Sequence, residues 1–244
     1  ADLDGVSRPG GAGGGGDGAA PLPNETWFAR AVQRLTHILT TLTPAGRLYE
    51  IDVRLRPSGN AGPLVSTLAG FESYQLDEAW TWEHQALVRA RPVAGDAALG
   101  ERFESVRRRV LCQARDTDKL RADIADMRMR IAREKPLPKA GFDLKLSPGG
   151  RVDVEFIAQY LVLAHAHALP QLAAPRATAD ILRLADTLGL LDAGQGEALA
   201  AAFVTLCALE RRQTLQGAGG VIEPAPAATA AHTVLDAWAR LFGR

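Results

Sequence analysis

One short segment of the sequence alternates charged and apolar side chains, and its charged residues are the best candidates for chemistry. They are Glu50, Asp52, Arg54 and Arg56. An extended backbone places all four on one face, roughly 7 Å apart from one to the next. Carboxylates suit Mg²⁺ and guanidinium groups suit phosphate oxygens, so this face has the chemistry of nucleotidyl transfer. A solvated strand face with weak ion pairs is the alternative, and the spacing alone favours it.

Two neighbouring features bear on that choice. Residues 57–63 follow at once and are rich in Gly and Pro. Such a loop lets backbone N–H groups approach an anion, which makes the two interpretations equally good. Asp2 and Asp4 would share a face in an extended segment and would offer a second carboxylate pair. Because Gly5 and Pro9 make a poor strand, the spacing alone favours a frayed terminus there.

An aromatic cluster supplies a second candidate. Trp80 and Trp82 are two residues apart, so a helix places them on different faces. We expect one of them to be buried and the other to line a cleft. His84 follows Glu83, which suggests an acid–base pair. A single histidine in a helix is more often a packing or surface residue, and that interpretation is favoured.

A third candidate is the turn at Gly149 and Gly150, which opens a helix. The charged residues around it are Asp143, Lys145, Asp153 and Glu155. A helix N-terminus that follows a glycine turn can bind an anion through free N–H groups. Acidic residues in a first turn also complement the helix dipole, so an anion site and a structural role are equally supported.

The elements that must position these residues follow from hydrophobic periodicity. Period-two alternation predicts strands over residues 48–57 and 86–93, and a short strand-like segment over 142–146. Residues 5–23, rich in Gly, Ala and Pro, are expected to form a flexible loop. The fold class is therefore α+β and mostly helical. Helical spacing and capping residues predict helices over 24–42, 66–76 and 77–85, helices capped by Asp96 and by Asp116 or Asp118, and helices over 152–164, 176–189, 193–216 and 226–243.

Composition argues against several classes of protein. Lys plus Arg and Asp plus Glu both number 28 among the 244 residues, so any anion site must be local. Neither nucleic acid nor a membrane is an expected partner. No apolar run reaches the roughly 18 residues that a membrane span needs. Cys112 and Cys207 are far apart and lack metal-ligand spacing, which argues against a zinc site or disulfides and for a reducing, cytoplasmic setting.

Three stretches, read together, resemble one family. They are LYEIDVRLRPSG from Leu48, EAWTWEHQALVRAR from Glu78, and FDLK from Phe142 with GGRVDVEF from Gly149. In this order they resemble the C-terminal adenylyltransferase half of bacterial glutamine synthetase adenylyltransferase. The resemblance implies a partial nucleotidyltransferase fold of the polymerase β type, followed by a helical bundle.

The resemblance also implies an activity. Members of the family transfer AMP from ATP to a tyrosine hydroxyl of glutamine synthetase, with Mg²⁺ and under the control of a PII signalling protein. A separate N-terminal half removes AMP. Asp52 resembles the third carboxylate of the metal site, and Asp2 and Asp4 resemble the first two, which reverses the interpretation from spacing. To these catalytic and metal-binding residues we add, as ATP-binding residues, Arg54, Arg56 and Lys145.

The resemblance divides the chain into a partial nucleotidyltransferase domain, residues 1–95, and a helical bundle domain, residues 96–244. The glycine-rich segment that precedes the Asp2 motif in the family is absent here. We therefore expect an N-terminally truncated copy with little AMP transfer of its own. One alternative is a related enzyme that uridylylates PII, against which the second and third stretches argue. The other is a helical module that contacts glutamine synthetase or PII without chemistry.

Overall fold

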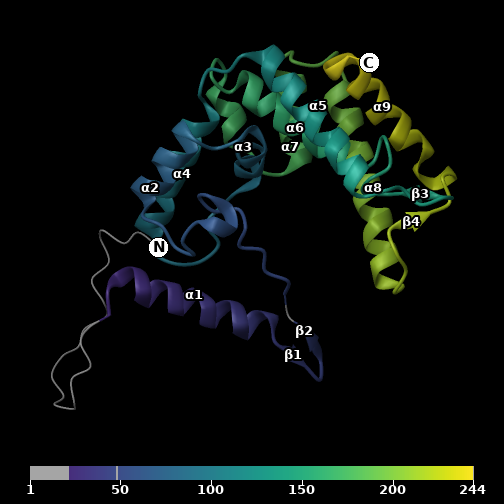
Figure 1. The fold of residues 1–244 in the computed structure, drawn as a ribbon. Helices are drawn as coiled ribbons and strands as arrows, with labels where there is room; N and C mark the ends of the chain where they lie inside the picture. The colour runs from purple at the N-terminus through teal and green to yellow at the C-terminus, as the bar shows by residue number, and fades with distance from the viewer. Residues whose placement is uncertain (1–21, 48, 244) are drawn as a thin grey trace. The chain divides into compact units, whose positions relative to one another are not determined.

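The computed structural model describes residues 22–47 and 49–243, and this part of the chain is mostly helical with four two-residue strands (Figure 1). Its contacts divide it into two compact units. The first comprises the described part of Ala1–Ala79 together with Pro92–Val106, and the second comprises Trp80–Arg91 together with the described part of Arg107–Arg244. Within the described residues, no helix is both long and apolar enough to cross a membrane.

The first unit carries the alternating segment. Its elements are α1 (Asn24–Thr40), β1 (Leu42–Thr43), β2 (Gly46–Arg47), the 3-10 turn η1 (Gly59–Ala61), α2 (Leu68–Asp77) and the start of α4 (Ala97–Leu111). β1 and β2 form a small antiparallel hairpin in which Leu42 lies opposite Arg47. The rings of Phe71 and Phe103 lie 5.8 Å apart and pack α2 against α4. α1 and α2 confirm the helices predicted over 24–42 and 66–76.

The predicted strand over residues 48–57 is wrong. Its described part, residues 49–57, lies outside every helix and strand. The two strands nearby, β1 and β2, pair only with each other, so this segment has no ladder partner among the described residues. Its backbone is bonded locally instead, because the N–H of Arg54 donates to the carboxylate of Asp52 at 2.9 Å. Such a side-chain-to-backbone bond competes with sheet pairing.

The second unit is a helical bundle arranged around α6. Its elements are α3 (Thr81–Arg89), the end of α4, α5 (Thr117–Glu134), β3 (Phe142–Asp143), α6 (Arg151–His165), the 3-10 turn η2 (Pro170–Ala173), α7 (Thr178–Thr187), α8 (Gln195–Leu215), β4 (Val221–Ile222), the 3-10 turn η3 (Ala225–Ala227) and α9 (Ala228–Phe242). α6 contacts α3, α5, α7, α8 and α9 (Figure 1). Most of its apolar side chains, including Ile157 and Leu161, are buried and form the centre of the core.

Most of these elements match the periodicity, with one clear exception. Asp96 accepts a hydrogen bond from the N–H of Leu99 at 2.8 Å, and Asp116 accepts from Asp118 and Lys119, as predicted for helix caps. The strand-like segment predicted over 142–146 is confirmed for its first two residues as β3, which pairs antiparallel with β4, and residues 144–146 form a turn. The predicted strand over 86–93 is wrong, because α3 continues to Arg89 and the rest is loop.

Arginine side chains hold the ends of helices in this unit. The Arg107 side chain is 1% exposed, and its guanidinium donates to the main-chain carbonyls of Leu87, Val88 and Ala173. The first two carbonyls belong to the last turn of α3, where carbonyls lack the N–H donor four residues further on that they would have inside the helix. Arg115 binds the last carbonyls of α4 in the same manner. Both arginines therefore act as side-chain caps of helix C-termini, Arg107 from the following helix and Arg115 from four residues beyond the end of its own helix.

Candidate functional site

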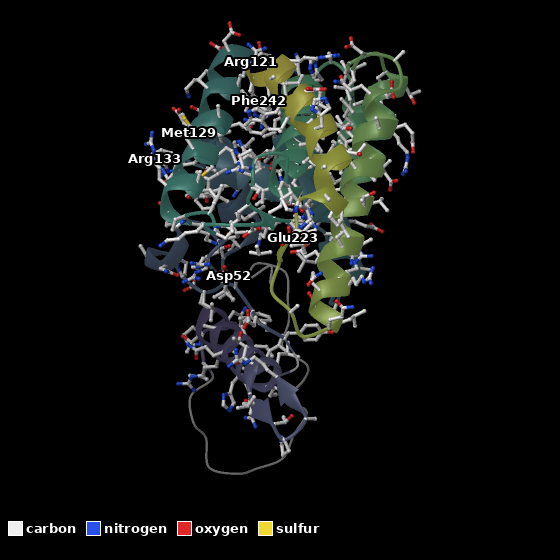
Figure 2. The ribbon with its side chains drawn as sticks, turned by 90° about the vertical axis from the view of Figure 1, so that its right-hand side faces the viewer. Asp52, Arg121, Met129, Arg133, Glu223 and Phe242 are labelled. Carbon is white, nitrogen blue, oxygen red and sulfur yellow. The ribbon has the colours of Figure 1, made fainter. Side chains whose placement is uncertain are left out.

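Asp52 and Arg54 form a tight pair at the surface of the first unit. The Arg54 Nε lies 2.9 Å from Oδ1 and 3.0 Å from Oδ2 of Asp52, and its Nη2 lies 2.5 Å from Oδ2. Both side chains are exposed, and Asp52 is labelled in Figure 2. The hydrogen bonds from Arg54 lower the pKa of Asp52 from 3.8 to about 2. Asp52 is therefore a fully ionised carboxylate at neutral pH, reachable from solvent.

The flanking residues of the alternating segment do not form one continuous face with this pair. Glu50 lies 3.5 Å from Arg47, in a weak surface ion pair. Arg56 donates from Nη1 to the carbonyl of Val53 at 2.6 Å. Its Nε is buried and has no hydrogen-bond partner among the described residues. Arg54 is thus the only one of the two arginines that contacts the acidic side chains of this segment.

The loop after Arg56 is a closed turn. Ser58 has a φ of 59° and Gly59 one of 54°, both in the left-handed region. The N–H of Gly59 donates to the carbonyl of Arg56 at 2.8 Å, and that of Ala61 donates to Ser58 at 3.1 Å. A side chain at Gly62 would lie 2.0 Å from the Pro57 carbonyl oxygen, so only glycine fits there. These N–H groups bind the turn itself, which removes one reason for expecting them to bind an anion.

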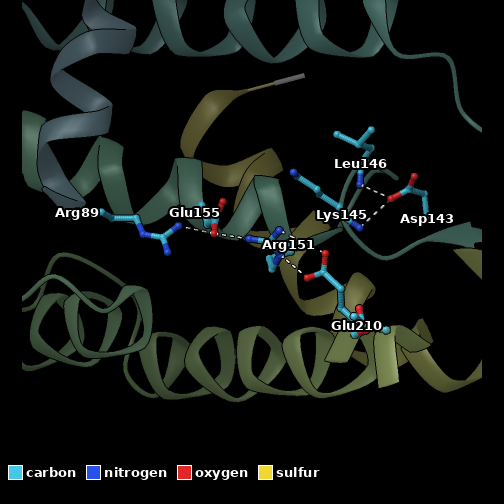
Figure 3. A network of polar contacts seen from close by, with 8 residues as sticks. Arg89, Asp143, Lys145, Leu146, Arg151, Glu155 and Glu210 are labelled. Carbon is cyan, nitrogen blue, oxygen red and sulfur yellow. Dashed lines mark hydrogen bonds and ion pairs between the residues drawn. The ribbon is translucent and has the colours of Figure 1, made fainter. Parts of the chain in front are cut away.

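Lys145 lies on the other unit, in the turn between β3 and α6 (Figure 3). The carboxylate of Asp143 accepts hydrogen bonds from the N–H groups of Lys145 and Leu146, at 2.9 Å and 2.8 Å. This Asx turn fixes the backbone and leaves the Lys145 side chain exposed. Lys145 is therefore a cation held on an ordered turn.

The first turn of α6 is saturated by the protein itself. The N–H groups of Arg151 and Val152 donate to the carbonyls of Leu144 and Lys145. The Asp153 carboxylate accepts from the N–H of Gly149 at 2.7 Å. These N–H groups are already paired within the protein. A structural role for this helix start is therefore favoured over an anion site.

Asp153 is also the partner of a buried arginine. Arg128 of α5 forms an ion pair with it and donates to the carbonyl of Leu146 at 2.7 Å. The Asp153 side chain is only 5% exposed. Burial raises the pKa of Asp153, and the bonds from Arg128 and Gly149 oppose that rise. The pair fastens α5 to the turn that carries Lys145.

A half-buried chain of charges joins three helices beside this turn (Figure 3). Glu155 of α6 accepts from Arg89 of α3 at 2.8 Å and from Arg151 at 2.7 Å. Arg151 in turn contacts Glu210 of α8 at 2.8 Å. The second and third stretches singled out in the sequence are therefore in direct contact through Arg89 and Glu155.

The aromatic cluster behaves differently from the expectation. Trp80 is 70% exposed and Trp82 is 38% exposed, so the prediction that one is buried is wrong. α3 begins at Thr81, which leaves Trp80 outside the helix as its N-cap residue, and the Glu83 carboxylate accepts from the Trp80 N–H at 2.9 Å. His84 is half-buried, and its Nδ1 lies 3.4 Å from Nη2 of Arg115. The packing interpretation of His84 is the better one.

The three proposed metal-binding carboxylates are not seen together. Asp2 and Asp4 lie outside the described residues. Among the residues that are described, no group of three His, Cys, Asp or Glu side chains could hold a metal ion. Asp52 thus offers one oxygen-donor group.

Sequence reasoning missed Arg128 and Glu210, which support the motif residues. A signal for Arg128 existed, because it lies four residues after Ile124 and so takes a core position of α5. An arginine at such a position needs a buried acidic partner. Nothing local identifies Asp153 as that partner, since 25 residues separate the two.

Two family models match the chain. Residues 2–106 match "Glutamate-ammonia ligase adenylyltransferase", and residues 118–218 match "GlnD PII-uridylyltransferase". The first region holds the Asp52–Arg54 pair and the second holds Lys145 with its supporting turn.

Curated relatives match across both regions. A bifunctional glutamine synthetase adenylyltransferase/adenylyl-removing enzyme of Thioalkalivibrio sulfidiphilus is 45% identical over 93% of this chain and 23% of its own length. The enzyme of the same name from Xanthobacter autotrophicus is 52% identical over 72% of this chain and 18% of its own. That from Pseudomonas putida is 42% identical over 92% and 24%. The chain thus spans less than a quarter of the length of these relatives.

Proposed function

The chain belongs to the family of bifunctional glutamine synthetase adenylyltransferase/adenylyl-removing enzymes, and we propose that it forms part of the centre that transfers AMP from ATP to a tyrosine of glutamine synthetase. The observation that carries this proposal is the exposed, ionised carboxylate of Asp52 inside the region that matches the adenylyltransferase model. The proposal includes the nucleotidyltransferase fold that the sequence resemblance implies.

Mg²⁺ is the metal that this reaction implies, and the donor chemistry of Asp52 suits it. A hard cation prefers oxygen ligands, and Asp52 stays ionised even in mild acid. Asp2 and Asp4 are proposed as its companions. When bound, the metal would activate the tyrosine hydroxyl and neutralise the leaving pyrophosphate.

The cations near these groups are proposed to bind the phosphates of ATP. The Arg54 side chain is 71% exposed, so its guanidinium can exchange the Asp52 carboxylate for a phosphate oxygen without a change in the core. A planar guanidinium matches either anion by two parallel hydrogen bonds. Lys145 adds a point charge on a fixed turn, and Arg56 adds a second guanidinium.

A second candidate function is a helical module that contacts glutamine synthetase or PII without chemistry. The observation in its favour is the second unit itself, which has its own buried core around α6 and carries the second family match. PII is proposed as a regulatory partner in either case. The two functions differ in whether the chain binds ATP.

The experiment that separates them measures Mg²⁺-dependent ATP binding by calorimetry. We expect Asp52→Asn to weaken that binding at least tenfold, because the variant keeps the shape of the side chain and loses its charge. Asp118→Asn is the control, since Asp118 is also an exposed carboxylate with one arginine partner, Arg121. Equal affinities for the wild type and both variants would contradict the proposed site. Transfer of labelled AMP to glutamine synthetase is then measured with the same proteins.

A further inference from the structure

The end of α5 and the exposed segment that follows it carry a group of cations that the described part of the protein does not pair. They are Arg130, Arg133, Lys135 and Lys139, all exposed and none in an ion pair among the described residues. Glu134 is the only acidic residue between positions 129 and 139, and Asp126 lies one turn earlier. The local charge is therefore strongly positive in a chain whose overall charge is zero.

This group differs from the arginines elsewhere on the same helix. Arg121 is paired with Asp118 at 2.9 Å, and Arg128 is paired with the buried Asp153. The unit therefore pairs the arginines that it uses to hold its own elements. Cations left without a partner on one surface raise the local potential and attract an acidic ligand.

Two apolar side chains lie among these cations. Met129 is 47% exposed and Leu137 is 43% exposed. Figure 2 shows Met129 and Arg133 side by side on the outer side of α5, as expected for residues four apart in a helix. Met and Arg are both enriched in protein–protein interfaces, where an apolar centre is combined with complementary charge. A nucleotide phosphate alone would leave the apolar side chains uncovered.

We infer that this α5 surface, made of Met129, Arg130, Arg133, Lys135, Leu137 and Lys139, docks an acidic surface of the protein substrate. The inference rests on the proposed function, which makes the acceptor of AMP a protein, glutamine synthetase. The surface shares no residue with the proposed ATP-binding set, so docking and ATP binding are expected to respond to different substitutions.

The test measures the affinity of the full chain for glutamine synthetase by biolayer interferometry, without ATP, at about 50 and 200 mM salt. We expect Arg130→Glu with Arg133→Glu to weaken binding at least tenfold at the lower salt. The difference from the wild type should shrink at the higher salt, because surface charges are then screened. Arg211→Glu with Arg212→Glu is the matched control, as it reverses two exposed cations of α8 and is expected to leave the affinity unchanged.

Several outcomes would overturn this inference. They are no binding of glutamine synthetase by the wild type, equal affinities for the wild type and the α5 variant, and an equal loss in the α8 control. ATP binding, measured on the same proteins, is expected to be the same in both charge-reversal variants and the wild type. If Asp52→Asn loses ATP binding and still docks, the two sites are separate. If Asp52→Asn binds ATP as tightly as the wild type does, that result contradicts the proposed function alone.

Discussion

The guanidinium of Arg54 covers both carboxylate oxygens of Asp52, two residues earlier in the chain. The same carboxylate accepts the main-chain N–H of Arg54, so one side chain organises both the backbone and the charge of this segment. The residue proposed to bind the metal is thus held by a residue proposed to bind phosphate. When substrate binds, Asp52 is expected to contact the metal and Arg54 the phosphate, in place of their contact with each other.

Replacement of Arg54 should change the titration of Asp52. In Arg54→Gln the guanidinium hydrogen bonds and the charge that lower the pKa of Asp52 are lost while the main-chain N–H remains, so the pKa should rise from about 2 part of the way toward 3.8. A carboxyl group with a lowered pKa contributes stability above its unfolded value and loses it as pH falls through the folded value. The local order of this segment should therefore fail at a higher pH in the variant. Carbon-detected NMR of the Asp52 carboxyl checks this, and an unchanged midpoint would contradict it.

Loss of Arg128 should be costly because it leaves Asp153 buried without its charged partner. Breaking such a pair by removing one member costs about 3 to 5 kcal/mol. We expect Arg128→Met to lower the free energy of unfolding by this amount, and Arg128→Met with Asp153→Asn to lower it by less than the sum of the single changes. Urea unfolding of the four proteins measures the coupling. Strict additivity would show that the pair contributes nothing.

Arg107 offers a test with its sequence neighbour as control. Arg107→Met removes donors to three buried carbonyls, each bond to a charged group contributing about 1.5 to 3 kcal/mol. We expect the free energy of unfolding to fall by at least about 3 kcal/mol. Arg108→Met changes an exposed residue of the same helix and should cost less than about 0.5 kcal/mol. Equal effects of the two substitutions in urea unfolding would refute the capping role.

Two glycines with similar backbone angles should respond differently to alanine. Gly149 has a φ of 79°, and a side chain there would lie 2.6 Å from the carbonyl oxygen of Ala231. Gly189 has a φ of 70° and open space around it. Gly189→Ala should cost only the backbone term of about 1 to 2 kcal/mol, and Gly149→Ala should cost at least about 2 kcal/mol more. Thermal unfolding compares them, and an equal cost would contradict the close approach.

The sequence predicts the helices well because a helix depends on residues close together in sequence, namely apolar residues at helical spacing and a cap residue. The cap residues Asp96 and Asp116 mark their helix starts, and buried positions recur at helical intervals. The strand over 48–57 could not be judged in the same way. Alternating side chains indicate a strand, but a strand also needs a partner elsewhere in the chain, and the bond from Arg54 to Asp52 uses the backbone locally.

The candidate site is predictable only in part for the same reason. Asp52 and Arg54 are neighbours in sequence, so their contact follows from spacing. The contacts of Arg89 with Glu155 and of Arg128 with Asp153 join residues that are far apart, and only the fold brings them together. The grouping of Asp2 and Asp4 with Asp52, and the boundary between two domains near residue 95, stay predictions.

The hydrogen bonds of the Arg107 side chain have a consequence for which positions can change among homologous sequences. Its three acceptors are main-chain carbonyls of Leu87, Val88 and Ala173, and every amino acid supplies such a carbonyl. Substitutions at the acceptor positions therefore keep the hydrogen bonds, whereas a substitution of the donor loses all three at once. The constraint is one-sided. Across homologous chains, the identity of the residue at position 107 should vary far less than the identities of the three residues whose backbone it binds.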